Sequence, residues 1–278
     1  MKVHFQRINS KTVKICPRLK PVDERPIKGA DMFPEIYCNV FLCARKKSGK
    51  STVVYNIIKN CASPETTVIV FASTVNKDDT YYTIRKYCEA KGIPFVGYAS
   101  LKDEGANKIE ALIRALEHQA EMEMEESEDE KPKKKKQPCV LLDTDSDEEP
   151  RKRRAKYRVP EYILVFDDLS NELRDPYMRK LLKENRHYKA KVIISSQHPN
   201  DLLPEQLRQI DYWLVFKGMP EEKLEKIYSD ADIAIPYELF RKIYKKATSK
   251  PYSFLYIDAK EDTFRVNFNT KVNIVEEE

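Results

Sequence analysis

The feature that most constrains the fold is the stretch 36–60, in which an apolar run, a short basic turn and a helix-favouring run follow one another. The apolar residues 36–43 predict a strand, and residues 52–58 predict the first turns of a helix. Strand, loop and helix in this order are the setting of a phosphate-binding loop. In such a loop, backbone N–H groups and the helix N-terminus converge on phosphate oxygens.

The basic turn matches the P-loop pattern G-x-x-x-x-G-K-[ST] except at its first position, where alanine stands in place of glycine. Alanine tolerates a positive φ less well than glycine, but it is small enough to lie beneath phosphates. We expect Lys50 to reach the β- and γ-phosphates and Ser51 to hold Mg²⁺. A lysine-rich surface turn that matches by chance is the alternative. The expected nucleotide-binding residues are Ala44, Arg45, Lys46, Lys47, Ser48, Gly49, Lys50, Ser51 and Thr52.

A second stretch, residues 162–169, is an apolar run that ends in two carboxylates, Asp167 and Asp168. Such a run suits a strand buried on both faces of a parallel sheet, and acids at its carboxyl end would lie in the crevice where these sheets bind ligands. A Walker B strand has this form: Asp167 would hold Mg²⁺ and Asp168 would polarise the attacking water. A buried strand followed by an acidic turn is the alternative. Together and in this order, the two stretches predict an ATPase-type core that binds ATP and Mg²⁺.

Composition sets wider bounds. The 278 residues suffice for one large α/β domain or two small ones, and 41% hydrophobic content allows a real core although 34% of the residues are charged. A net charge of +5 is weak evidence for a nucleic-acid partner. The cysteines form no C-x-x-C pair and the histidines no metal-ligand spacing, which favours reduced thiols in an intracellular protein. No apolar run approaches the ~18 residues of a membrane span.

The chain divides into residues 1–30, with a short strand expected at 1–8 and an extended arm after it, and an ATPase domain, residues 31–278. We expect a disordered insert at 121–158 within that domain, because acidic and basic blocks alternate there and apolar residues are few. Its basic blocks, 133–136 and 151–154, are similar to nuclear-localisation signals or to a DNA-binding tether. A solvated linker whose blocks neutralise one another is the alternative.

The rest of the chain alternates between buried strands and helices. Further strands are expected at 67–72, 93–98, 191–197 and 212–216, and helices at 81–90, 106–124, 172–188, 202–208, 220–229 and 236–247. Residues 252–257 and 263–268 alternate around a polar turn and predict a closing β-hairpin. The predicted fold class is α/β: a mostly parallel central sheet flanked by helices, of the additional-strand, RecA-like kind of P-loop NTPase, with a C-terminal hairpin.

Gln197, at the end of the strand 191–197, is placed like the polar sensor of additional-strand P-loop ATPases. That sensor lies on a strand between the P-loop and Walker B strands and orients the attacking water. A strand-end glutamine in an ordinary turn is the alternative.

Residues 185–218 resemble the genome-packaging ATPases of nucleocytoplasmic large DNA viruses and virophages, which belong to the FtsK/HerA superfamily. The matching features are Arg186-His187, the strand ending in Gln197, Leu203-Pro204, Arg208, Asp211 and Phe216-Lys217-Gly218. Together with the two motifs above, the resemblance covers about 31–118 and 160–258. Three features depart from the family: Ala44, Asp168 where many relatives have glutamate, and the charged insert.

The resemblance implies a homo-oligomeric ring, a hexamer or a pentamer, with ATP between subunits. An arginine of one subunit would stabilise transition-state charge in the next, with Arg208 the first candidate and Arg186 the second. The alternative for either arginine is a surface residue that pairs with Glu205 or Asp211. The ring would grip double-stranded DNA through phosphate contacts, for which Lys77 and Arg85 are candidates.

The implied function is an ATP-driven translocase that packages a viral genome, with capsid or portal components as partners. Its place would be the cytoplasmic virus factory or the nucleus of an infected cell, or the virion. A HerA-like cellular helicase or translocase, a P-loop small-molecule kinase and a nucleotide-dependent scaffold are the alternatives.

Overall fold

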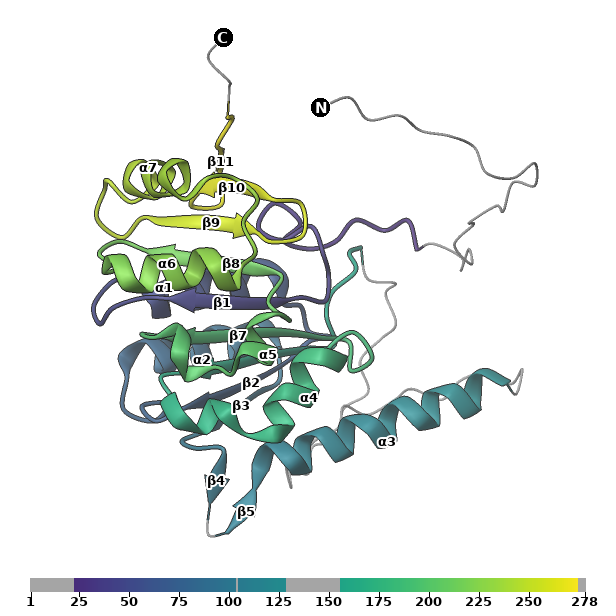
Figure 1. The fold of residues 1–278 in the computed structure, drawn as a ribbon. Coiled ribbons are helices and arrows are strands. Elements are labelled where there is room, and N and C mark those ends of the chain that lie inside the picture. Colours follow the sequence, from purple (N-terminus) through teal and green to yellow (C-terminus); the bar gives the residue numbers. More distant parts are fainter. Residues whose placement is uncertain (1–22, 104, 129–155, 275–278) are drawn as a thin grey trace, which may run out of the picture.

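The computed structural model describes residues 23–103, 105–128 and 156–274, and they build a large mixed sheet with helices on both faces (Figure 1). The strands of the nine-stranded sheet are β1 (Asn39–Cys43), β2 (Thr67–Ala72), β3 (Phe95–Tyr98), β6 (Tyr162–Asp167), β7 (Ala190–Ser196), β8 (Tyr212–Phe216), β9 (Phe254–Asp258), β10 (Thr263–Val266) and β11 (Thr270–Lys271). A separate small hairpin is formed by β4 (Lys102–Asp103) and β5 (Ala106–Asn107).

The strand order in the sheet is β11-β10-β9-β8-β1-β7-β6-β2-β3. From β8 to β3 every neighbouring pair is parallel, whereas β9, β10 and β11 are joined antiparallel. The central strands are buried on both faces, which explains their unbroken apolar sequences. The expected fold class is confirmed, including the position of β7 between β1 and β6.

The helices are α1 (Lys50–Cys61), α2 (Asp79–Lys91), α3 (Lys108–Glu128), α4 (Pro176–Glu184), α5 (Pro204–Leu207), α6 (Glu221–Asp230) and α7 (Tyr237–Ala247), with 3-10 turns at Ser170–Arg174 and Pro199–Asp201. Helices α1 and α2 pack on one face of the sheet, and α3 to α7 contribute to the core on the other (Figure 1). Helices therefore connect the successive parallel strands, as in other α/β sheets that are covered on both faces.

The C-terminal hairpin forms as expected, with Asp258 opposite Thr263. Because β9 also pairs antiparallel with β8, the hairpin extends the central sheet. The small hairpin β4–β5 and the strand β11 were not predicted, since two-residue strands have too few positions to show a periodicity.

The ends of the charged segment differ from the expectation of a disordered insert at 121–158. Helix α3 runs on to Glu128, because the residues 121–128 are mostly glutamate and methionine, which favour a helix. At the other end, the Arg158 backbone N–H donates to the Pro26 carbonyl at 2.9 Å, and Lys28 donates to the Arg158 carbonyl at 3.0 Å. The basic blocks 133–136 and 151–154 lie outside the described residues.

The described part of the N-terminal arm packs on the domain. Lys28 of the arm donates from Nζ to the Ala62 carbonyl just after α1. Directly after the arm, Phe33 is buried among the rings of Tyr212, Tyr256 and Phe268, with centroid distances of 5.2, 6.1 and 5.7 Å. The strand expected at residues 1–8 lies outside the described residues. In the described ranges, no helix combines the length and apolar character that crossing a membrane requires.

Candidate active site

The loop between β1 and α1 lies at the carboxyl edge of the parallel strands. Gly49, with φ 90° and ψ 12°, caps α1, and Lys47 also takes a positive φ of 60°. The Ser48 hydroxyl donates to the Arg45 carbonyl at 2.6 Å and closes the turn. Among the described residues no side chain caps α1, and its first turn carries no acid. Its N-terminal amides are therefore available to an anion.

Alanine at the first position of this loop is compatible with its backbone. Ala44 is fully buried, its φ is not positive, and its N–H donates to the Ser196 carbonyl of β7 at 3.0 Å. Glycine is needed where φ is positive or where a side chain would collide. The departure of Ala44 from the motif therefore has no conformational cost.

Lys50 and the two acids of 162–169 meet at this edge. The Lys50 Nζ lies 3.2 Å from Asp167 Oδ1 and also forms an ion pair with Asp168 Oδ2. Lys50 and Asp167 are buried, while about a third of the Asp168 side chain is exposed. Asp168 has a φ of 50°, and its N–H donates to the Ser195 carbonyl at 3.0 Å, so it turns sharply out of β6. The structure thus brings Lys50 together with two adjacent acids that lie far from it in the sequence.

A tyrosine that the sequence did not single out completes this cluster. The Tyr81 hydroxyl donates to Asp167 Oδ2 at 2.5 Å from the first turn of α2, and only 1% of Tyr81 is exposed. Burial and the neighbouring Asp167 charge raise the pKa of Tyr81 well above its usual value. The phenol therefore stays protonated and acts as a donor. The helical spacing of Tyr81 with Ile84 and Cys88 marks it as inward-facing, but it does not reveal the partner.

The oxygen atoms near Lys50 suit a magnesium ion. Asp167 Oδ1 makes only the ion pair with Lys50, and the buried Ser195 hydroxyl of β7 has no hydrogen-bond partner among the described residues. Carboxylate and hydroxyl oxygens are the ligands that Mg²⁺ prefers. Ser51 follows Lys50 in the first turn of α1. The residues present therefore fit the expected metal, and its assignment to Ser51 and Asp167 stays a prediction.

Gln197 is the first residue after β7, and β7 has the neighbouring strands that are expected for the strand of a polar sensor. β7 lies between β1 and β6, with Ser196 opposite Cys43 and Ser195 opposite Asp167. The Gln197 carbonyl accepts from Lys223 Nζ at 2.9 Å, which anchors the backbone here. The role of its side chain stays a prediction.

The two candidate arginines lie at the opposite edge of the sheet. Arg208 is exposed at the end of α5, next to Gln209, whose carbonyl accepts from the Asn39 side chain at 2.7 Å. Asn39 begins β1 and Cys43 ends it, so at ~3.3 Å per residue these edges are about 13 Å apart.

Arg186 precedes β7 at that same edge and pairs with Glu35 at 3.0 Å and with Asp211 at 3.9 Å. Neither Arg186 nor Arg208 lies beside the P-loop of this chain, and the arginine-finger role of either residue stays a prediction.

The candidate DNA-contacting cations border a hollow beside Tyr81. It is lined by Val75, Asn76, Lys77, Asp78, Asp79, Tyr82 and Arg85, which form the loop after β2 and the first turns of α2. The Arg85 guanidinium lies 5.5 Å from the Phe95 ring centroid and 3.4 Å from Asn76 Oδ1. Both cations therefore stand at the same edge of the sheet as the Lys50 cluster.

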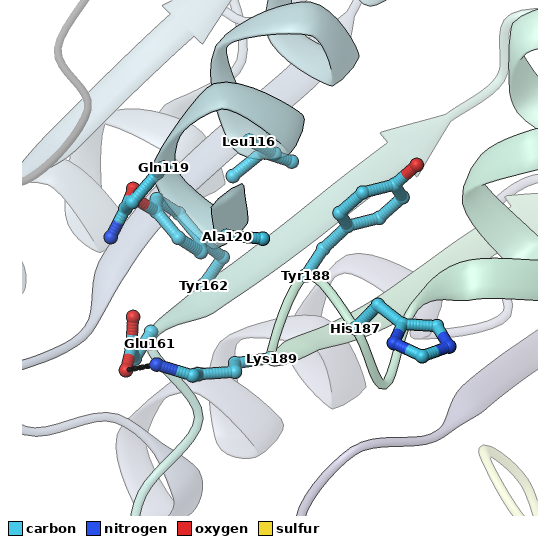
Figure 2. A pocket seen from close by; sticks show the side chains of 8 residues that line it. All are labelled: Leu116, Gln119, Ala120, Glu161, Tyr162, His187, Tyr188 and Lys189. Carbon is cyan, nitrogen blue, oxygen red and sulfur yellow. Dashed lines mark hydrogen bonds and ion pairs between the residues drawn. The ribbon is translucent and has the colours of Figure 1, made fainter. Parts of the chain in front are cut away.

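A second hollow lies at the amino edge, between α3 and the starts of β6 and β7 (Figure 2). Leu116 and Ala120 border it from α3, and the ion pair between Glu161 and Lys189, at 2.7 Å, borders it on the other side. Its volume of about 10 Å³ is enough for about one water molecule. It cannot hold a nucleotide.

Comparison with known proteins connects this geometry to a fold. No family model matches the chain. The genome packaging NTPase B204 of Sulfolobus turreted icosahedral virus 2, in a complex with sulfate, superposes with a TM-score of 0.50 at 18% identity, covering 87% of this chain and all of that one. The chain has the fold of a packaging NTPase.

Two further proteins are similar to this chain, one in structure and one in sequence. The cytoplasmic domain of the Type VII secretion ATPase EccC from Thermomonospora curvata gives a TM-score of 0.48 at 12% identity, over 86% of this chain and 26% of that one. In sequence, the uncharacterized protein 075L of Invertebrate iridescent virus 6 is 31% identical over 103 residues, which is 36% of this chain. The match spans 40% of the length of that viral protein.

Proposed function

We propose that this chain is an ATPase that uses ATP hydrolysis to move double-stranded DNA into a viral capsid. The observation that carries the proposal is the ion-pair cluster of Lys50 with Asp167 and Asp168 at the N-terminus of α1, where no side chain of the described residues binds the helix amides. A lysine, two carboxylates and free helix amides at one edge of a parallel sheet are the parts that phosphoryl transfer needs. The fold shared with the packaging NTPase B204 supports the same reading.

In this proposal, ATP binding rearranges the ion pairs. The amides of the loop 44–49 and of the first turn of α1 bind the phosphates, and Lys50 moves from the two carboxylates to the β- and γ-phosphates. Ser51 and Asp167 hold Mg²⁺, which neutralises phosphate charge when bound. Asp168, released by Lys50 and partly exposed, then accepts the proton of the attacking water, which Gln197 orients.

The arginine that completes the site comes from a neighbouring subunit of a ring. Arg208 is exposed and forms no ion pair within the described ranges, whereas Arg186 is engaged by Glu35. A free guanidinium is ready to stabilise transition-state charge in another subunit, so Arg208 is the better candidate.

DNA contacts come from the exposed Lys77 and the half-buried Arg85 at the rim of the hollow after β2. Phosphate contacts carry no sequence information, which suits a motor that must move any sequence. We further propose that the ring works in an infected cell with capsid or portal components, which accords with the fold shared with a viral genome packaging NTPase.

The test is ATP hydrolysis by the purified chain with and without linear double-stranded DNA at two salt concentrations. We expect DNA to stimulate turnover, and the stimulation to fall as salt rises, because the DNA contacts are electrostatic. Lys50→Ala should abolish turnover, and Lys59→Ala, an exposed lysine at the other end of α1, should not change it. No turnover in the wild type, or phosphate transfer to a small acceptor instead of water, would contradict the proposal.

A further inference from the structure

An exposed aromatic side chain lies against the P-loop. Tyr252 belongs to the turn between α7 and β9, and 70% of it is exposed. A Cβ atom added to Gly49 would stand 3.3 Å from Tyr252 Cδ1 and 3.8 Å from its Cβ atom. The tyrosine therefore packs on the glycine that caps α1, with most of its surface open to solvent.

The turn that carries Tyr252 is held in place. Lys217, just after β8, donates from its backbone to the Ser253 carbonyl at 3.3 Å and from its side chain to the Ser249 carbonyl at 2.8 Å. Thr248 and Ser253 on either side of the turn are buried. Tyr252 itself takes a positive φ of 58°, which is strained for a residue with a side chain. A strained, anchored residue that points a large ring into solvent is a feature of ligand sites.

The position of Tyr252 suits the base of a nucleotide. The cluster that would bind the phosphates lies on the side of β7 and β6, since Asp167 ends β6 and Asp168 follows it. Tyr252 precedes β9, on the other side of β1 and beyond β8. A nucleotide whose phosphates reach Lys50 would thus extend its base toward the tyrosine.

We propose that Tyr252 is the stacking platform for the purine base of the bound nucleoside triphosphate. The inference rests on the proposed function, because it needs a nucleotide in the P-loop. Stacking uses the face of a base and not its hydrogen-bonding edge, so it is tolerant of base identity. The site therefore favours a nucleotide over an inorganic polyphosphate and discriminates little between adenine and guanine.

The test compares ADP with inorganic pyrophosphate, both with Mg²⁺, by titration calorimetry. Neither compound is hydrolysed further in this reaction, and only ADP carries a base. We expect Tyr252→Ala to raise the Kd of ADP about tenfold or more and to leave the Kd of pyrophosphate within about a factor of two. Tyr252→Phe keeps the ring and should bind ADP like the wild type.

Tyr82→Ala is the matched control, because Tyr82 is another strongly exposed tyrosine, at 58%, that does not touch the P-loop. Thermal melts verify that each variant is folded. An unchanged ADP affinity in Tyr252→Ala, or an equal loss for ADP and pyrophosphate, overturns the stacking role while the P-loop assignment stands. A wild type that binds neither compound overturns the nucleotide site, and the proposed function with it.

Discussion

Replacing Tyr81 by phenylalanine tests whether the Lys50 cluster is built as described. The change removes one oxygen and keeps the ring, so it opens no large cavity in the core around α2. It deletes the 2.5 Å hydrogen bond to Asp167, in which both residues are buried. A hydrogen bond to a charged group contributes ~1.5–3 kcal/mol. Because Asp167 keeps its ion pair with Lys50 at 3.2 Å, we expect the lower end, about 1.5 kcal/mol, for the protein without nucleotide.

The loss should be larger in function than in stability. When ATP draws Lys50 to the phosphates, as we propose, Tyr81 is the donor to Asp167 that remains within the described part of the chain. The variant should therefore need about tenfold more Mg²⁺ for half-maximal ATP hydrolysis. Urea denaturation measures the first effect, and a magnesium titration of the hydrolysis rate measures the second.

Tyr256→Phe provides the matched control for this measurement. Tyr256 is fully buried like Tyr81, but its hydroxyl has no hydrogen-bond partner among the described residues. Removing an unpaired buried hydroxyl should leave the free energy of unfolding unchanged or raise it. If Tyr81→Phe destabilises the protein no more than Tyr256→Phe, and the magnesium requirement stays the same, the reasoning about Asp167 is wrong.

Three further substitutions probe the same site. Without nucleotide, Lys50→Ala should lower the free energy of unfolding by about 2 kcal/mol, because it leaves two neighbouring carboxylates without their cation. An unchanged midpoint of urea denaturation would refute the ion-pair cluster. Asp168→Asn should bind Mg·ATP normally but hydrolyse it ~10²–10⁴-fold more slowly. If a binding titration shows instead that the variant has lost its affinity for ATP, Asp168 holds the metal and the assigned roles of Asp167 and Asp168 are reversed. Arg208→Ala should bind ATP and lose ~10³–10⁵ in rate, and mixing it with Lys50→Ala should restore part of the activity through interfaces with both parts intact. Near-normal turnover of Arg208→Ala would move the assignment to Arg186.

The sequence was sufficient to predict those parts of the site that consist of one strand and the turn that follows it. The loop 44–49 and the acids Asp167 and Asp168 could be predicted because each follows a continuous apolar run. The carboxyl ends of parallel strands meet at one edge, so their convergence also followed. The resemblance to additional-strand P-loop ATPases implied that β7 lies between β1 and β6, and alternation around a polar turn predicted the hairpin β9–β10.

The parts that depend on tertiary neighbours could not be predicted. Tyr81, Ser195 and Tyr252 contribute to the site from three separate elements, and nothing in the local sequence says which loop packs on which. The spacing of Arg208 and Arg186 likewise does not reveal that both lie at the amino edge, away from the P-loop of their own subunit.

Movement along DNA is the central claim, and release of a third strand from a DNA triplex tests it most directly. A motor that travels along a linear duplex strips off an oligonucleotide bound at a distant triplex site, whereas an ATPase that only binds DNA leaves it in place. We predict release by the wild type with ATP, none with a non-hydrolysable analogue, and none by Lys50→Ala. ATP hydrolysis by the wild type without release of the third strand would contradict the account.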